Sequence, residues 1–245
     1  MDSPSIAIVG PGRLGGSVAA RLNAVGWRVT VIGRGEPIPV MPVTWLTVPD
    51  AEIAARALDV PPGGLVIHSA GCLGPDVLSP HRGAVLHPLM TFPPPHDATI
   101  PCTADGHPDA LAAAVRLAQA LGWHLHQGVV NRPAYHAAAC LASGHLAACF
   151  AEASHVFAAS TGVSAEVARS ILAPLAQASL ARVVAAGAAA ISGPAVRGDV
   201  TTIAAHRATL PPGTLPLYDA GTAAIQKLSE CSQKINDGVK SGDYS

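Results

Sequence analysis

Residues 5–15, with the sequence SIAIVGPGRLG, decide how the first half of this chain folds. The apolar run of residues 5–9 stops at a glycine, as is typical of a buried parallel strand. Gly10, Gly12 and Gly15 then give the spacing G-x-G-x-x-G, and a segment with helical spacing of apolar residues follows directly. A strand, turn and helix in this order present unpaired N–H groups and a helix dipole to phosphates. The sequence therefore predicts a dinucleotide-binding unit of the Rossmann type.

Each glycine of this loop has an expected task. Gly10 makes the tight turn, Gly12 lets the backbone approach a diphosphate, and Gly15 lets the helix pack closely on the strand. A plain turn between strand and helix, without a ligand, is the alternative interpretation. Arg13 opens the helix, where its side chain could stack on adenine or add a positive charge. The loop residues expected to contact the cofactor are Gly10, Pro11, Gly12, Arg13, Leu14 and Gly15.

The residues after the second expected strand, Arg28–Ile32, select the cofactor. Proteins that bind NAD place Asp or Glu there, and its carboxylate holds the ribose 2′-OH. This chain has Gly33 and Arg34, and an arginine can pair with the 2′-phosphate of NADP. Glu36 offers an alternative, because a carboxylate bent back to the ribose would restore the use of NAD. We expect NADP(H) as the cofactor.

Short apolar runs and helical patterns alternate up to residue 130, which predicts a mostly parallel sheet. Only nine proline-rich residues separate Arg34 from the next expected strand, Thr44–Val48. A standard mononucleotide-binding half would place a helix and a strand there, so we predict a shortened Rossmann sheet that lacks one helix–strand unit. The other expected elements are strands Leu65–His68, Ala84–His87 and Trp123–Gln127, and helices Asp50–Leu58 and His107–Leu121.

The pattern after residue 130 is helical throughout, so the fold class is α/β followed by an all-helical domain. We place the boundary near Asn131 and Arg132. This gives a dinucleotide-binding domain at 1–131, a helical domain for substrate binding and dimer formation at 132–230, and a flexible tail at 231–245. The expected helices run from Pro133 to about Ser160 and then over Ser164–Ala186, Asp199–Thr209 and Pro216–Ser229.

Composition narrows the class of protein. A formal net charge of −1 without a Lys/Arg cluster argues against nucleic-acid binding. No membrane span is expected, since His145 interrupts Ala137–Ala151 and Gly193-Pro194 interrupts Val183–Val196. No signal peptide is recognised, and the five cysteines lack C-x-x-C spacing. We expect a cytoplasmic protein without a metal site.

Three segments directly follow expected strands: Thr47-Val48-Pro49, Ser69-Ala70-Gly71 and His87-Pro88. Ligands of open parallel sheets bind in the crevice outside the carboxyl ends of the strands. We therefore expect all three segments to line one crevice together with the glycine loop.

Six motifs in a fixed order resemble a family of bacterial Rossmann-like proteins whose C-terminal helical domain has no assigned function. This family is similar to the wider group of ketopantoate reductase, pyrroline-5-carboxylate reductase and β-hydroxyacid dehydrogenases. The resemblance covers nearly the whole chain. Its motifs are residues 10–15, 47–50, 68–71, 87–92, 135–139 and 193–199.

The resemblance implies roles for the strand-end segments and a homodimer packed through the helical domain. The motif with His87 and Thr91 would face the substrate. The family pattern has Ser-Asn on the long helix, where this chain has Ser143-Gly144-His145. An asparagine on that helix binds substrate in the wider group, so His145 is expected to take its place here. The segments that would flank the nicotinamide end of the cofactor contain Val48, Pro49, Ser69 and Gly71.

A reductase of this kind needs a proton donor, because hydride transfer to C=O or C=N leaves a charge to be neutralised. A histidine with a pKa near neutrality suits this role. His87 at a strand end and His136 in the long helix are the candidates, and a hydrogen-bonded structural role is the alternative for each. Tyr135 or Ser143 could hold the substrate oxygen. Arg197 could clamp a substrate carboxylate or form a structural ion pair.

The leading hypothesis is an NADPH-dependent reductase of a small keto acid or imino acid, with a ketopantoate-like substrate as the family-based expectation. The first alternative is an NADP-binding sensor that acts through a partner without chemistry. The second is an enzyme that tailors a specialised metabolite, in which Gly144 and His145 mark an altered pocket.

Overall fold

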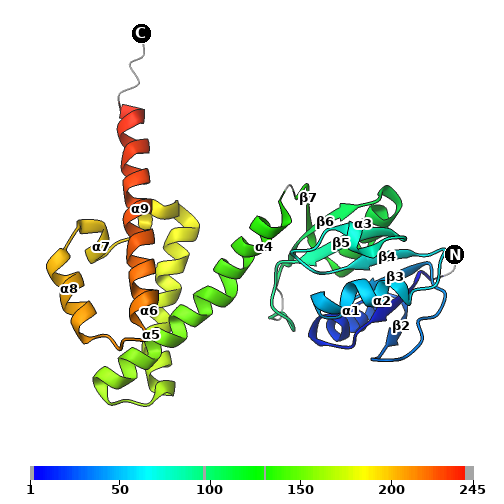
Figure 1. Ribbon diagram of the computed structural model, residues 1–245, viewed down its shortest axis with the longest axis horizontal. Coiled ribbons are helices and arrows are strands. Elements are labelled where there is room, and N and C mark those ends of the chain that lie inside the picture. The colour runs from blue at the N-terminus through cyan, green and yellow to red at the C-terminus, as the bar shows by residue number, and fades with distance from the viewer. Residues whose placement is uncertain (1–2, 96–97, 130, 241–245) are drawn as a thin grey trace, which may run out of the picture. The chain divides into compact units, whose positions relative to one another are not determined.

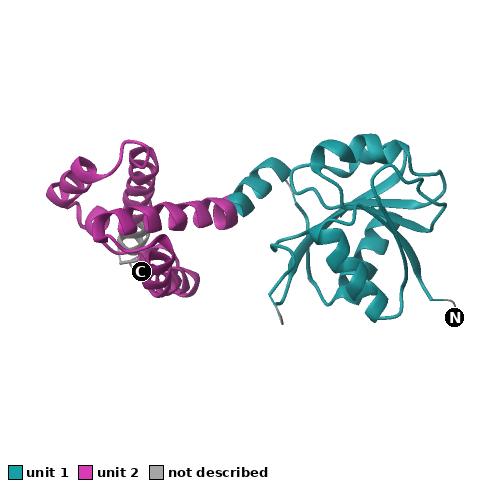
Figure 2. Cartoon of the chain, turned by 90° about the horizontal axis from the view of Figure 1, so that it is seen from below, with its two compact units in different colours: residues 1–140 teal, residues 141–245 magenta. Residues whose placement is uncertain are grey.

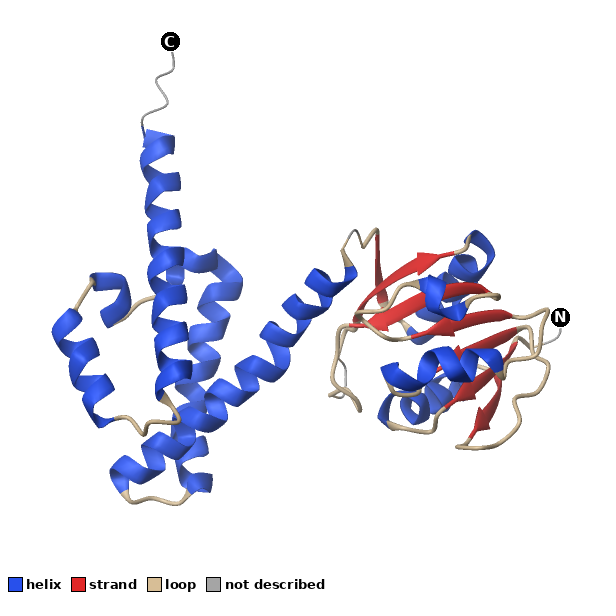
Figure 3. Cartoon of the chain, viewed as in Figure 1, coloured by secondary structure: helices blue, strands red, loops and turns tan. Residues whose placement is uncertain are grey.

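The structure is a computed structural model that describes residues 3–95, 98–129 and 131–240 of the 245 residues. The chain divides into two compact units, Met1–Cys140 and Leu141–Ser245 (Figure 2). Within the described residues, the strands all belong to unit 1 and unit 2 is helical (Figure 3).

Unit 1 is built on one sheet of seven strands in the order β2-β1-β3-β4-β5-β6-β7 (Figure 1). Neighbouring strands run parallel, apart from β5 and β6, which pair antiparallel. The predicted fold class is confirmed. The strands are β1 (Ser5–Val9), β2 (Arg28–Ile32), β3 (Val43–Leu46), β4 (Leu65–His68), β5 (Arg82–Pro88), β6 (Pro101–Gly106) and β7 (His124–Gln127).

The predicted shortening of the sheet is also present. No helix separates β2 from β3, and a loop joins them over the proline-rich residues 33–42. As a result, β1 pairs with β2 on one side and with β3 on the other. The strand order therefore reverses direction at β1, which is the position where open parallel sheets bind ligands.

The core of unit 1 lies on both faces of the sheet. Along β1, Ile6 and Ile8 enter one cluster, while Ala7 and Val9 enter the other, because neighbouring side chains of a strand point to opposite faces. The first cluster is covered by α1 (Arg13–Ala24) and α3 (Pro108–Leu121), and the second by α2 (Ile53–Leu58) and the 3₁₀ helix η2 (Pro75–Leu78). A further 3₁₀ turn, η1 (Asp50–Glu52), precedes α2.

Strand β6 was not expected from the sequence. Its residues, PCTADG, start with proline, end with glycine and lack the β-branched alternation that marks a strand. Pairing with β5 on one side and β7 on the other holds it in the sheet. Its presence matters for function, because it places Thr103 directly opposite His87.

The helical part also differs from the expectation in its boundaries. The division between the units falls after Cys140 rather than near Asn131, because the first turns of α4 (Arg132–Cys140) pack on the sheet. The expected flexible tail at 231–245 is helical as far as Lys240, and residues 241–245 lie outside the described part. Unit 2 contains the π-helix η3 (Leu141–His145), α5 (Leu146–Thr161), α6 (Ala165–Ala186), the 3₁₀ helix η4 (Gly187–Ala190), α7 (Pro194–Arg197), α8 (Val200–Thr209) and α9 (Leu215–Lys240).

One segment of unit 2, Ala165–Arg197, is long and apolar enough to cross a membrane by length and composition. The sequence analysis expected no such stretch. The difference arises because α6 is continuous from Ala165 to Ala186 and carries its charged residues near its ends. The most apolar 18-residue window of this segment is not buried within the single chain, so α6 presents an exposed apolar surface.

Candidate functional site

The glycine loop lies between β1 and α1, as predicted, and its conformation explains its glycines. Gly10 has φ of +103°, a region that side chains rarely adopt, and its N–H donates to Ile32 O at 2.9 Å. A Cβ on Gly15 would lie 2.0 Å from Gly10 O. The hydroxyl of Thr47 stabilises the turn by donating a hydrogen bond to Gly10 O at 2.8 Å. The loop is therefore held rigidly between β1, α1 and the end of β3.

The space in front of the loop is open. A Cβ on Gly12 would meet no atom within 4 Å, and Gly12 is the N-cap of α1 without a side-chain cap. A cavity of about 190 Å³ lies here. The N–H groups at the start of α1 thus face free space, as a diphosphate requires, and the residues fit a dinucleotide. The cavity is lined by Val9, Gly10, Pro11, Gly12, Gly33, Arg34, Gly35, Thr47, Val48, Pro49, Glu52 and Arg56.

The adenosine end of this cavity carries charges of both signs. Arg34 lines the cavity and pairs with Glu52 at 3.1 Å. Glu36 bends back so that its Oε2 accepts the N–H of Gly33 at 2.7 Å. The arginine expected to hold a 2′-phosphate and the carboxylate of the alternative interpretation are therefore both present.

Two residues predicted to flank the nicotinamide, Val48 and Pro49, line this cavity. The hydroxyl of Ser69 forms hydrogen bonds with neighbouring strands of the sheet. It donates to Leu86 O at 2.8 Å and accepts from Trp45 Nε1 at 2.8 Å. Gly71 has a different role from the loop glycines. A Cβ on Gly71 would lie 2.5 Å from His136 Cδ2 and 2.9 Å from His87 Nε2.

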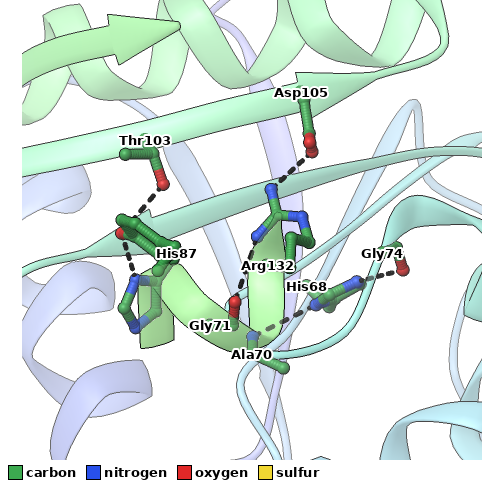
Figure 4. A network of polar contacts seen from close by, with 9 residues as sticks. His68, Ala70, Gly71, Gly74, His87, Thr103, Asp105 and Arg132 are labelled. Carbon is green, nitrogen blue, oxygen red and sulfur yellow. Dashed lines mark hydrogen bonds and ion pairs between the residues drawn. The ribbon is translucent and has the colours of Figure 1, made fainter. Parts of the chain in front are cut away.

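A cluster of polar side chains gathers beside Gly71 (Figure 4). Nδ1 of His87 lies 2.7 Å from the hydroxyl of Tyr135, and Thr103 donates to that hydroxyl at 3.0 Å. The rings of His87 and His136 meet edge to face with centroids 5.9 Å apart. Three of the four predicted catalytic residues, His87, Tyr135 and His136, therefore lie together, although they come from two distant segments of the chain.

The environment of His87 keeps it neutral. Burial, followed by the neighbouring His136 and Arg132, lowers the pKa of His87 to about 4. The expectation of a pKa near neutrality is therefore wrong for His87, because removal from water disfavours the charged ring. A neutral imidazole still carries one N–H, so His87 remains able to donate a hydrogen bond.

Arg132, expected from the sequence only to mark the domain boundary, lies at this cluster. Its side chain is 7% exposed, pairs with Asp105 at 2.5 Å, and donates from Nη1 to Gly71 O at 3.4 Å (Figure 4). Its Nε is buried without a hydrogen-bond partner among the described residues. Because Arg132 begins α4, it ties the helix that carries Tyr135 and His136 to the sheet.

His68 is buried and serves the loop after β4. Its Nδ1 accepts the N–H of Ala70 at 3.1 Å, so its proton is on Nε2, which donates to Gly74 O at 3.0 Å. Burial lowers the pKa of His68. Both ring nitrogens are occupied, and His68 is a structural residue of the site.

The remaining predicted site residues are not gathered into this cluster by the described contacts. Thr91 is exposed in the loop after β5. Ser143 and His145 belong to the π-helix at the start of unit 2, and such π-helical turns are frequent at functional sites. His136 Nε2 lies 3.8 Å from Cys140 Sγ, one turn further along the same helix.

In unit 2, Arg197 is the last residue of α7, and Asp199 lies between α7 and α8. Asp199 caps α8 by accepting from the N–H of Thr202 at 3.0 Å and from its hydroxyl at 2.7 Å. These two hydrogen bonds lower the pKa of Asp199. Asp199 is therefore the N-cap of α8, and Arg197 is exposed. Among the described residues, no group of His, Cys, Asp and Glu is placed to hold a metal ion.

The fold and the glycine loop together define a Rossmann-type protein with a helical C-terminal unit. A family model described as a domain of unknown function (DUF2520) matches residues 100–225, just over half of the chain. The chain therefore belongs to this family, and the resemblance inferred from its motifs is confirmed. No curated protein sequence matches it.

Solved structures share the fold along nearly the whole chain. A Bacteroides fragilis protein with the proposed assignment of NADP oxidoreductase is 20% identical with a TM-score of 0.76, covering 92% of this chain and 98% of its own. An Aspergillus terreus reductive aminase in complex with NADPH is 20% identical with a TM-score of 0.63, covering 95% and 99%. Plasmodium falciparum pyrroline carboxylate reductase with NADP bound is 10% identical with a TM-score of 0.59, covering 94% and 99%. At these identities the likeness concerns the fold.

Proposed function

We propose that this protein is an NADPH-dependent oxidoreductase that reduces the C=O or C=N bond of a small keto acid or imino acid. One observation carries the proposal. The carboxyl edge of a single sheet bears an open glycine loop after β1 that fits a diphosphate and, three strands further along at β5, the cluster of His87, Tyr135 and His136. The names of similar structures, which include NADP oxidoreductase and reductive aminase, support the same class.

Different residues of the chain bind the cofactor and donate the proton. The bound dinucleotide supplies a hydride to the electrophilic carbon of the substrate. The N–H groups at the start of α1 hold the diphosphate, and Arg34, which lines the same cavity, is available to a 2′-phosphate. His87 donates a hydrogen bond to the substrate oxygen or nitrogen, where charge develops.

Direct titration tests the binding half of the proposal. NADPH is expected to bind with a change in its fluorescence, and NADH to bind more weakly. A panel of 2-keto acids and cyclic imines then tests turnover through the loss of NADPH absorbance. Binding without turnover on the whole panel would favour the sensor alternative. No binding of either dinucleotide would overturn the proposal.

We propose further that the protein is a homodimer packed through unit 2. Three large apolar side chains of α6 are more than half exposed: Ile171 at 51%, Leu175 at 65% and Val184 at 78%. An apolar cavity of about 520 Å³ opens between α5, α6 and α9. Exposed apolar side chains beside an apolar cavity are typical of an interface, and a second copy of the chain is the simplest partner.

Sedimentation velocity tests the dimer. The protein is expected to sediment as a dimer at micromolar concentration, and Leu175→Asp is expected to dissociate it. Val40→Asp is the matched control, because Val40 is 75% exposed in unit 1 and outside the proposed interface. A monomeric wild-type protein, or dissociation by both substitutions alike, would contradict the proposal.

A further inference from the structure

The hydrogen bonds around Tyr135 carry more information than the presence of the cluster alone. The hydroxyl of Tyr135 lies between Thr103 Oγ1 at 3.0 Å and His87 Nδ1 at 2.7 Å (Figure 4). Thr103 and His87 face each other across the antiparallel pair β5–β6, so the sheet fixes the distance between them. Tyr135 reaches into this gap from α4.

A phenol has one hydrogen, and this limits what Tyr135 can do. Thr103 donates to the phenol oxygen, which leaves the phenol hydrogen for the acceptor on its other side. We propose that Tyr135 donates this hydrogen to Nδ1 of His87, holds the proton of His87 on Nε2, and resupplies that proton during catalysis through the ring. Thr103, Tyr135 and His87 would thus form one relay, and this inference rests on the proposed reductase function.

The direction of Nε2 agrees with this role. A Cβ on Gly71 would lie 2.9 Å from His87 Nε2, so this nitrogen faces the Gly71 loop at the carboxyl end of β4. That edge of the sheet is where ligands bind in this class of fold. The absence of a side chain at Gly71 leaves Nε2 accessible there, while Nδ1 points inward to Tyr135.

The charge state also agrees. The groups that act on the titration of His87 are His136 in α4, Arg132 in α4 and His68 in β4, and all three lower its pKa in addition to burial. His87 is therefore neutral at pH 7 and holds a single proton. A neutral ring can give up the Nε2 proton only if Nδ1 gains another proton. A hydrogen-bond donor at Nδ1, such as Tyr135, can supply it.

The proton step balances as follows. When the substrate carbon is reduced, the substrate oxygen or nitrogen would take the proton of His87 Nε2. His87 Nδ1 takes the proton of Tyr135, so the ring stays neutral and changes tautomer. The phenolate left on Tyr135 keeps the hydrogen bond from Thr103 and the favourable charge of Arg132 until a water reprotonates it. The charge of Arg132 and the bond from Thr103 both act to lower the pKa of Tyr135, although burial raises it overall.

Nitrogen-15 NMR of histidine-labelled protein tests the tautomer without any cofactor or substrate. His87 is expected to show a protonated Nε2 and an unprotonated Nδ1 at pH 7. His68 is the internal reference, because its contacts require the same tautomer. In Tyr135→Phe, the donor is lost and His87 is expected to become a mixture of tautomers. A protonated Nδ1 on His87 in the wild-type protein would overturn the proposal.

Kinetics test the relay itself. Tyr135→Phe is expected to lower turnover by roughly 10²-fold, the range of a general acid–base contribution, with little change in NADPH affinity. Thr103→Val, which removes the donor to the phenolate, is expected to lower turnover by about tenfold. Unchanged turnover in Tyr135→Phe would overturn the relay.

The pair His206 and Tyr218 provides a matched control. It repeats the same geometry in unit 2, with His206 Nδ1 2.8 Å from the phenol oxygen and centroids 5.8 Å apart. Tyr218→Phe is expected to alter the His206 resonances and leave turnover unchanged. If the His87 tautomer is as proposed but no substrate is reduced, the reductase function fails while the hydrogen-bond assignment stands. The two failures are therefore distinguishable.

Discussion

Two regions of unit 1 lie at the same edge of one sheet and are built in opposite ways. The glycine loop of residues 10–15 is local in sequence and acts through its backbone. The polar cluster takes His87 from β5, Thr103 from β6 and Tyr135 from α4, and it acts through side chains. The loop therefore depends on the absence of side chains, whereas the cluster depends on which side chains the tertiary structure brings together.

The largest expected effect on stability is a difference between Gly15, at the end of the loop, and its neighbour Gly16 in α1. A Cβ on Gly15 would lie 2.0 Å from Gly10 O and 2.5 Å from Thr47 Oγ1, whereas one on Gly16 would only approach Pro11 O at 3.9 Å. Gly15→Ala is expected to cost about 4 kcal/mol of stability or more, as strained backbone contacts can. Gly16→Ala is expected to be neutral or to stabilise α1 slightly. Urea unfolding measures both, and equal midpoints would show that the loop is not held as rigidly as the contacts indicate.

The second prediction concerns how the free energy of unfolding depends on pH. This dependence arises from His87 in the cluster and not from the glycine loop. His87 titrates near 6.5 when unfolded and about 4 when folded, so the unfolded chain binds the extra proton between these values. Stability from this group is complete above pH 6.5 and is lost as the pH falls toward 4, by at most about 3 kcal/mol. His87→Asn is expected to remove this part of the acid dependence while keeping an acceptor near Tyr135.

Guanidinium unfolding at several pH values measures this difference between wild type and His87→Asn. His68 contributes in the same direction in both proteins, since its pKa is also lowered, and it cancels in the comparison. Parallel stability curves for the two proteins across pH 4 to 6.5 would mean that His87 is not held neutral by the fold.

The third prediction asks whether both histidines of the cluster take part in chemistry. His136 faces the ring of His87 and lies against Gly71. His136→Ala is expected to lower turnover by about 10²-fold with little change in NADPH affinity, because the glycine loop binds the cofactor independently. His124→Ala is the control, since His124 is exposed on β7 and pairs with Pro101 rather than with a residue of the cluster. Full turnover in His136→Ala would remove His136 from the mechanism.

The contrast between the regions also explains what the sequence could predict. The glycine loop and the shortened connection after Arg34 are encoded in contiguous residues, so periodicity and glycine spacing predict them. The pairing of His87 with Tyr135 depends on how distant segments pack. Thr103 and Asp105 could not be recognised, because β6 is stabilised by its two neighbours and lacks a strand pattern of its own. Arg132 was read as a boundary residue, since its buried ion pair is visible only in three dimensions.

The smallest expected effect is a change in cofactor preference. It tests whether side chains, as well as the backbone of the glycine loop, determine which dinucleotide binds. Glu36 accepts the N–H of Gly33, next to Arg34. Its charge would repel a 2′-phosphate, while its position suits a ribose hydroxyl. Glu36→Gln keeps an acceptor for Gly33 and removes the charge, so the preference for NADPH over NADH is expected to rise by roughly three- to tenfold, or about 1 kcal/mol.

Titration of both dinucleotides with Glu36→Gln measures this ratio, and Arg34→Leu supplies the opposite change. Loss of Arg34 is expected to weaken NADPH binding and leave NADH binding nearly unaltered, because only the 2′-phosphate needs a cation there. If neither substitution moves the ratio, the preference does not arise from these two residues. If Glu36→Gln weakens NADH alone, Glu36 holds the ribose hydroxyl, and the cavity accepts both dinucleotides by means of two side chains of opposite charge.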